Sequence, residues 1–131
     1  MAGMTGMTLM LRFLLLSLFQ NASAVGGPGE IKAATQETQK LLAPLRTKVC
    51  HQAQEAGYTS EFTKFAAISE RLQVVAGRNH FVKVQVAPES YIHVRIFESL
   101  PHMKKDPELV AIELDHTYDS AIDIFPAAKE L

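Results

Sequence analysis

The sequence has one cysteine, no tryptophan and no surplus of either charge. Among its 131 residues, 13 are Lys or Arg and 14 are Asp or Glu. The single Cys50 excludes an internal disulfide and a zinc site built from cysteines. The balanced charge lacks the strongly basic footprint of nucleic-acid binding. Because 47% of the residues are hydrophobic and 21% charged, the composition excludes a disordered chain, and the length suits one domain.

The sequence also lacks an apolar run of about 20 residues, the length needed to cross a bilayer. The run Phe13–Phe19 is short, follows Arg12 and precedes Ala22-Ser23-Ala24, which has the small-residue pattern of a signal-peptidase site. We therefore predict a signal peptide over residues 1–24 and a single domain over residues 25–131, with no membrane segment in the mature form. Three alternatives stay open: a buried N-terminal helix, initiation at Met10, and cleavage after Ala22.

A helical pattern runs from Gln36 to Ala56. Thr35 is a plausible N-cap, Glu37 lies in the first turn, and Gly57 is the expected stop. Pro44 is expected to kink the helix or to mark an exposed bend. One apolar stripe follows the helical period: Leu42, Leu45, Val49, Ala53 and Ala56.

After Gly57 the apolar period changes to two, which indicates strands. We expect an extended segment over residues 62–75 with a bulge around Phe65-Ala66-Ala67, and a loop over residues 100–107. Three further strands are marked by alternating apolar residues: Val82, Val84 and Val86; Ile92, Val94 and Ile96; Val110, Ile112 and Leu114. Their short connections predict an antiparallel meander. The fold class is α+β: one long helix packed across a four- to five-stranded antiparallel sheet.

No constellation of residues indicates an enzyme. The sequence has no nucleophile elbow, phosphate loop or dinucleotide turn. The five histidines are scattered, and we interpret them as surface residues, although His80 and His93 lie on strands expected to pair. We therefore expect no catalytic residue, no metal and no cofactor. Cys50 is either a small buried residue or a thiol that links two chains.

The segment Gln73–Asn79 does not fit an ordinary hairpin. A hairpin tip is usually polar, yet Val74-Val75-Ala76 brings apolar side chains to it. Because side chains alternate along a strand, at least one of the two valines must face away from the helix. Two interpretations stay open: the valines cap the core at a strand end, or they form an exposed apolar tip that a partner covers.

The segment Gln73-Val74-Val75-Ala76-Gly77 resembles the hairpin signature of the cystatin superfamily of cysteine-protease inhibitors. A glycine near the expected mature N-terminus (Gly26, followed by Gly27) and a later Leu100-Pro101 occur in the family's order. The stretch from Gln73 to Pro101 is similar to the stefin branch in particular. The resemblance spans about Gly26 to Phe125 and implies a cystatin-like fold. The tail beyond Tyr118 matches poorly, so its role stays open.

The resemblance implies a wedge that enters the cleft of a papain-like protease of the cathepsin type and blocks it reversibly without being cut. Val25 would reach a non-primed subsite, Gly26 would bend the leader, and Leu100 and Pro101 would lie on the primed side with His102 at the rim. The implied protease-binding residues are Val25, Gly26, Gly27, Gln73, Val74, Val75, Ala76, Gly77, Leu100, Pro101 and His102.

The chain departs from both main branches of that superfamily. Stefins typically lack a signal peptide, whereas the secreted cystatins usually carry two disulfides and a Pro-Trp pair. We therefore expect a stefin-type inhibitor that is secreted or held in secretory-pathway vesicles, with a cytoplasmic inhibitor as the alternative for localisation. The expected state is a monomer, with a dimer through Cys50 or through hairpin swapping as an alternative. A non-inhibitory binding module with the same fold is the alternative for function.

Overall fold

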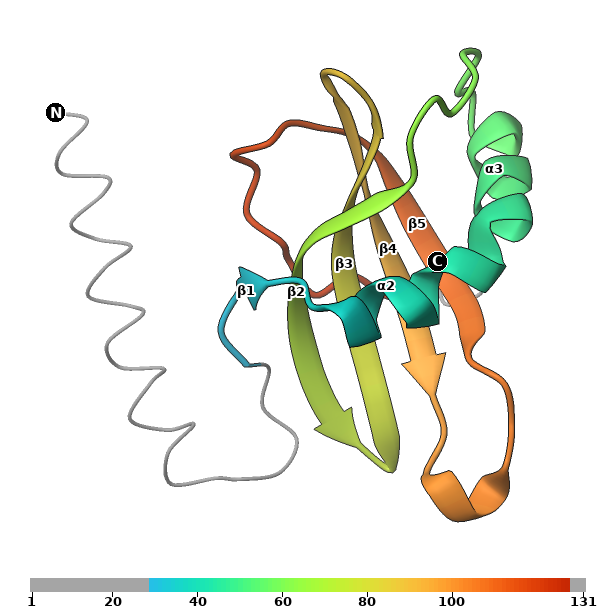
Figure 1. Cartoon of the computed structure of the whole chain (residues 1–131), viewed down its shortest axis with the longest axis vertical. Coiled ribbons are helices and arrows are strands. Elements are labelled where there is room, and N and C mark those ends of the chain that lie inside the picture. The colour runs from blue at the N-terminus through green and yellow to red at the C-terminus, as the bar shows by residue number, and fades with distance from the viewer. Residues whose placement is uncertain (1–28, 128–131) are drawn as a thin grey trace, which may run out of the picture.

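The computed structural model describes residues 29–127 as a helical layer lying across one face of a five-stranded antiparallel sheet (Figure 1). The predicted signal peptide, its cleavage site and Val25–Gly27 lie outside the described residues. The sheet order is β1-β2-β3-β4-β5, so neighbouring strands in the chain are neighbours in space. The strands are β1 (Lys32–Ala33), β2 (Ala66–Val75), β3 (Gly77–Ala87), β4 (Ser90–Glu98) and β5 (Glu108–His116). The predicted α+β class and antiparallel meander are confirmed.

The predicted helix is present but is divided at the proline. It consists of α2 (Gln36–Leu42), a 3₁₀ turn η1 (Ala43–Leu45) that contains exposed Pro44, and α3 (Arg46–Glu55). Thr35 caps α2, since its hydroxyl accepts a hydrogen bond from the backbone N–H of Thr38. Gly57 follows α3 with a φ of 107°, which favours glycine. The N-cap, bend and stop are thus confirmed.

The helical stripe is buried against the sheet as predicted, except at its end. Leu42, Leu45, Val49 and Ala53 are buried, whereas Ala56 is exposed after the last turn of α3. The opposing strand residues are fully buried in the same core: Val82, Val84, Val86, Ile92, Val94 and Ile96. Since α2 lies against β2 and α3 against β5, the helical layer crosses the whole sheet.

The first long strand is shorter than predicted. β2 begins at Ala66 rather than Phe62, and the expected bulge lies in its pairing with β3, between Ala67 and Ser69. Phe62 is buried from a loop instead, with its ring between those of Tyr58 and Phe65 at centroid distances of 5.3 and 5.9 Å. Because the ring of Phe62 is buried in the core, residues 62–65 lie in a loop and the strand begins only at Ala66.

The second face of the sheet is covered by the tail, whose role the sequence left open. Ile122 and Phe125 are buried there against Phe81 and Ala111. Three cationic side chains of the sheet donate to tail carbonyls: Arg71 to Ile122 at 2.8 Å, Arg95 to Phe125 at 2.9 Å, and Lys83 to Tyr118 and Ser120. The sheet is thus enclosed on both faces. Across residues 29–127, no helix has both the length and the apolar character needed to span a membrane.

Candidate functional site

The β2–β3 hairpin carries an exposed apolar tip. Val74 is 43% exposed, Val75 is 38% exposed, and Ala76 is the single residue between the paired Val75 and Gly77. Figure 1 shows this hairpin extending beyond the helical layer, which therefore does not cover its end. Alternation therefore buries neither valine. Of the two interpretations of this segment, the structure agrees with the exposed tip.

Gly77 is required by the geometry of the tip. Its φ is 122°, and an added Cβ would lie 2.6 Å from the carbonyl oxygen of Glu98 and 2.8 Å from the ring of Phe97. Any side chain would therefore be strained and would collide with β4. Asn79 lies in the strand rather than in the turn, and its Nδ2 donates to Oε1 of Gln73 at 3.0 Å. This bond joins the two strands just behind the tip.

The connection between β4 and β5 presents a second apolar surface. Leu100 is 40% exposed, and the following 3₁₀ turn η2 (Pro101–Met103) exposes Pro101, His102 and Met103. The backbone N–H of Met103 donates to the carbonyl of Leu100 at 2.9 Å, and Lys104 ends the turn with a φ of 52°. The sequence analysis did not select Met103, although it is 47% exposed beside Leu100. Its position in the loop between Pro101 and Pro107 is the sequence feature that could have predicted this exposure.

These two connections lie at the same end of the sheet because every second turn of an antiparallel meander does so (Figure 1). We call Val74–Ala76 together with Leu100–Met103 the apolar edge. The described chain also begins near this end, since the N–H of Gly29 donates to the carbonyl of Leu72 at 2.6 Å and its carbonyl accepts from Nε of Arg71 at 3.0 Å. Residues 25–27, which precede it, lie outside the described residues.

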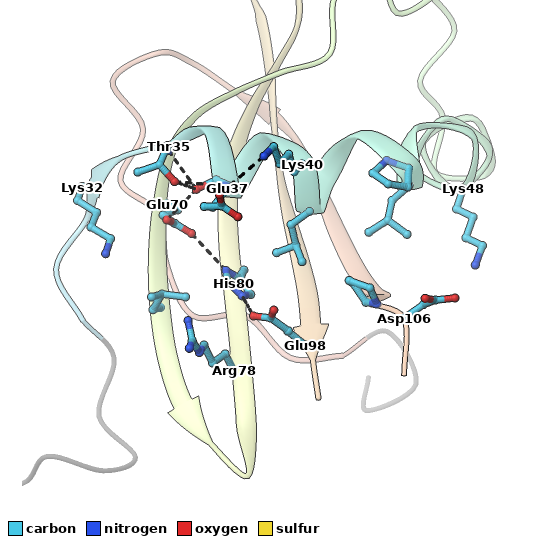
Figure 2. A pocket seen from close by; sticks show the side chains of 16 residues that line it. Lys32, Thr35, Glu37, Lys40, Lys48, Glu70, Arg78, His80, Glu98 and Asp106 are labelled. Carbon is cyan, nitrogen blue, oxygen red and sulfur yellow. Dashed lines mark hydrogen bonds and ion pairs between the residues drawn. The ribbon is translucent and has the colours of Figure 1, made fainter. Parts of the chain in front are cut away.

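A buried polar network braces the base of the hairpin against the helix (Figure 2). The Nδ1 of His80 lies 3.3 Å from Glu70, and its Nε2 lies 2.9 Å from Glu98. The hydroxyl of Thr38 donates to Glu70 at 2.8 Å, which ties α2 to the sheet. The hydrogen bond from His80 lowers the pKa of Glu70, assisted by Thr38 and opposed by burial. The network links α2, β2, β3 and β4 directly behind the apolar edge.

This network lines a cavity of about 760 Å³ between α2 and the sheet. Its rim carries both signs of charge, as Figure 2 shows: Lys32, Lys40, Lys48 and Arg78 lie there with Glu37 and Asp106. Sequence reasoning missed the network, although His80 has the same parity as Val82, Val84 and Val86 and so had to face the helix.

The interpretation of all histidines as surface residues is wrong for two of them. His80 is 7% exposed and His93 is fully buried, because each strand face is covered by a different part of the chain. The two rings lie on opposite faces of the sheet, so the conceivable contact between them does not occur.

Cys50 is half-buried and packs against the core, whereas His51 is exposed and pairs with Glu55 at 3.2 Å. Among the described residues, one group has metal-ligating chemistry: His93, Glu113 and His116.

Comparisons with known proteins give the chain's family. The cystatin domain family matches residues 26–118. Leukocyte cysteine proteinase inhibitor 1 of Sus scrofa is 38% identical over 100 residues, which cover 76% of this chain and 92% of that protein. Cystatin-A1 of Sus scrofa is 34% identical over 100 residues, with the same coverage. Cystatin-B of Homo sapiens is 40% identical over 80 residues, which cover 61% of this chain and 76% of that protein.

Proposed function

This chain belongs to the cystatin family, and we propose that it is a reversible, tight-binding inhibitor of papain-like cysteine proteases of the cathepsin type. The observation that carries the mechanism is the apolar edge, where Val74, Val75, Leu100 and Met103 are each 38–47% exposed at one end of the sheet. Exposed apolar side chains gathered on one edge are unfavourable in water and favour a partner that covers them.

The two connections of the apolar edge would enter the protease cleft together. Val74, Val75 and Ala76 would fill the cleft beside the catalytic residues, while Gln73 and Gly77 hold the tip narrow enough to approach them. Leu100 and Pro101 would lie on the primed side, with His102 at the rim. We add Met103 to these residues only because its side chain is exposed.

The rigidity of the tip supports inhibition rather than cleavage. The tip is held by strand pairing up to Val75, by the Gln73–Asn79 bond and by the close approach of Gly77 to β4. Such a surface has little conformational entropy to lose on binding, which supports tight association. The chain also reverses direction at Ala76, between the paired Val75 and Gly77, whereas a protease needs an extended segment in a substrate.

The N-terminal segment completes the proposed wedge. Val25 would reach a non-primed subsite, and Gly26 and Gly27 would bend the leader along the edge. The anchoring of Gly29 beside Leu72 and Arg71 supports this role, because it starts the described chain near the hairpin end of β2.

We further propose that residues 1–24 are a signal peptide, that residues 25–131 form the mature single domain, and that the inhibitor is secreted as a monomer. The Ala22-Ser23-Ala24 pattern supports this proposal. Mass spectrometry of the N-terminus of the native protein tests it, and a cytoplasmic protein with residues 1–24 retained would contradict it. Coinciding thermal melts with and without reductant are expected for the monomer, and a large drop on reduction would reveal a link through Cys50.

The decisive experiment is titration of active-site-quantified papain and several cathepsins with the mature chain. We expect stoichiometric, reversible inhibition without cleavage of the inhibitor, and no inhibition of trypsin, whose nucleophile and cleft differ. Removal of residues 25–27 is expected to weaken inhibition while leaving the thermal melt unchanged. Undiminished papain activity in a large excess of folded protein would overturn the proposal.

A further inference from the structure

Two histidines and a glutamate meet on the tail-covered face of the sheet, away from the apolar edge. His93 lies on β4, whereas Glu113 and His116 lie on β5. Oε1 of Glu113 lies 3.1 Å from Nε2 of His116 and 4.0 Å from Nδ1 of His93. One ligand-type atom from each residue falls within 4.8 Å of the other two.

A bulge brings His116 to this position. In a regular strand, residues 113 and 116 would point to opposite faces. Here His93 pairs with Glu113 but Tyr91 pairs with His116, so β5 carries one extra residue between the two pairs. Asp115 absorbs it with a φ of 63°. The bulge therefore turns His116 onto the face of His93 and Glu113, as bulges that re-aim a side chain do.

His93 is buried with both ring nitrogens unsatisfied by the described part of the chain. The residue is 0% exposed, and neither Nδ1 nor Nε2 has a hydrogen-bond partner among residues 29–127. A buried polar group without a hydrogen bond lowers the stability of the fold by about 1–3 kcal/mol unless a ligand or a donor satisfies it. Burial, with the nearby His116 and Lys83, lowers the pKa of His93 to about 3. The buried ring nitrogens are thus available to a ligand that reaches them.

We propose that His93, Glu113 and His116 bind one divalent transition-metal ion such as Zn²⁺ or Co²⁺, with water in the fourth position. Two imidazoles and one carboxylate are a ligand set that these metals accept, with bonds of about 2.0–2.2 Å. Such bonds place tetrahedral ligand atoms about 3.4 Å apart, so separations of up to 4.8 Å need to contract by at most about 1.4 Å. Access is through Glu113 and His116, whose side chains are 38% and 21% exposed.

Two adjustments accompany binding. The rings of His93 and His116 are stacked at 3.5 Å with an interplanar angle of 10°, and a metal lies in the plane of each ring it binds, so the part-exposed His116 ring must tilt. The hydrogen bond between His116 and Glu113 must also break, because a metal needs Nε2 of His116 without a proton. Lys83, paired with His93 on β3, faces the group and disfavours a cation, while Asp119 offsets its charge.

The test is a titration of the metal-stripped full chain with Co²⁺ and with Zn²⁺, followed by the visible spectrum of Co²⁺ and by calorimetry. We expect one equivalent to bind, with perturbation of the His93 ring signals in the NMR spectrum. His116→Gln and Glu113→Gln are each expected to weaken binding at least about 10-fold, since losing a residue that merely hydrogen-bonds to a ligand already costs that much. Both positions are partly exposed, and either variant suffices if the other fails to fold.

The matched control is His51→Gln, which removes the exposed His51–Glu55 pair at 3.2 Å. Its metal affinity is expected to equal that of the unmodified chain. Absence of saturable binding, retention of full affinity in both site variants, or equal loss in His51→Gln would overturn the proposal. Inhibition of papain is measured in parallel and does not depend on these residues, so failure of the metal site is distinct from failure of the inhibitor function.

Discussion

Replacing Val75 by aspartate separates binding from folding at the apolar edge. Val75 is 38% exposed and lies opposite Gly77, which offers no side chain to a new carboxylate. Val74 is 43% exposed but lies opposite Arg78, so an aspartate at that position gains a cationic neighbour. Val75→Asp is therefore the cleaner perturbation, and Val74→Asp is its companion.

The expected cost to folding is small. An exposed substitution changes the free energy of unfolding by about 0.5 kcal/mol, and the loss of strand propensity adds at most about 1 kcal/mol. The cost to binding is larger. The complex loses the burial of a valine, about 1.5–3 kcal/mol when complete, and must desolvate a carboxylate in an apolar cleft. We expect papain affinity to fall at least 100-fold, which corresponds to about 2.7 kcal/mol.

The assay pairs urea denaturation with inhibition constants from papain progress curves. The matched control is Val82→Asp, because Val82 is the same residue type on the neighbouring strand but is fully buried. We expect that variant to unfold or to lose several kcal/mol, since it buries an unpaired charge.

Two results would refute this reasoning. If Val75→Asp and Val74→Asp both destabilise the protein as strongly as Val82→Asp, the tip is part of the core. If both leave stability and papain affinity unchanged, the tip does not enter the cleft, and the wedge mechanism loses its principal contact.

Three further predictions concern stability. Gly77→Ala is expected to lower the free energy of unfolding by at least about 1–2 kcal/mol because of the positive φ at this position. The collision of the added Cβ with Glu98 lowers it further. An unchanged urea midpoint would contradict this. Phe125→Ala is expected to cost about 3 kcal/mol, since the ring is buried under the sheet; an unchanged thermal melt would show that the tail does not stabilise the fold. Without metal, stability is expected to fall as pH decreases from about 6.5 towards 3 by up to about 1.4 kcal/mol per unit, because His93 stays neutral when folded and takes up a proton when unfolded. His93→Phe should reduce this slope, and an unchanged slope would assign the acid sensitivity to other groups.

Local patterns in the sequence determined most of the fold. The alternation of Val82, Val84 and Val86 predicted the buried face of β3, because strand side chains alternate whatever their tertiary surroundings. Thr35 and Gly57 marked the helix ends, because capping and a positive φ are set by the residue itself. The hairpin motif and the Leu100-Pro101 loop located the candidate site, since each is a short continuous segment.

What the tertiary structure decided depends on contacts between residues far apart in the chain. The exposure of both Val74 and Val75 depends on where the helical layer stops covering the sheet, which no periodicity encodes. The tail beyond Tyr118 has no strong period, yet it packs on the second face because the sheet offers it apolar contacts and cationic donors. The burial of His93 follows from that cover, and its contact with His116 follows from a one-residue bulge. Since a shift of one residue reverses the face of a strand side chain, this cluster appears only when the register is known.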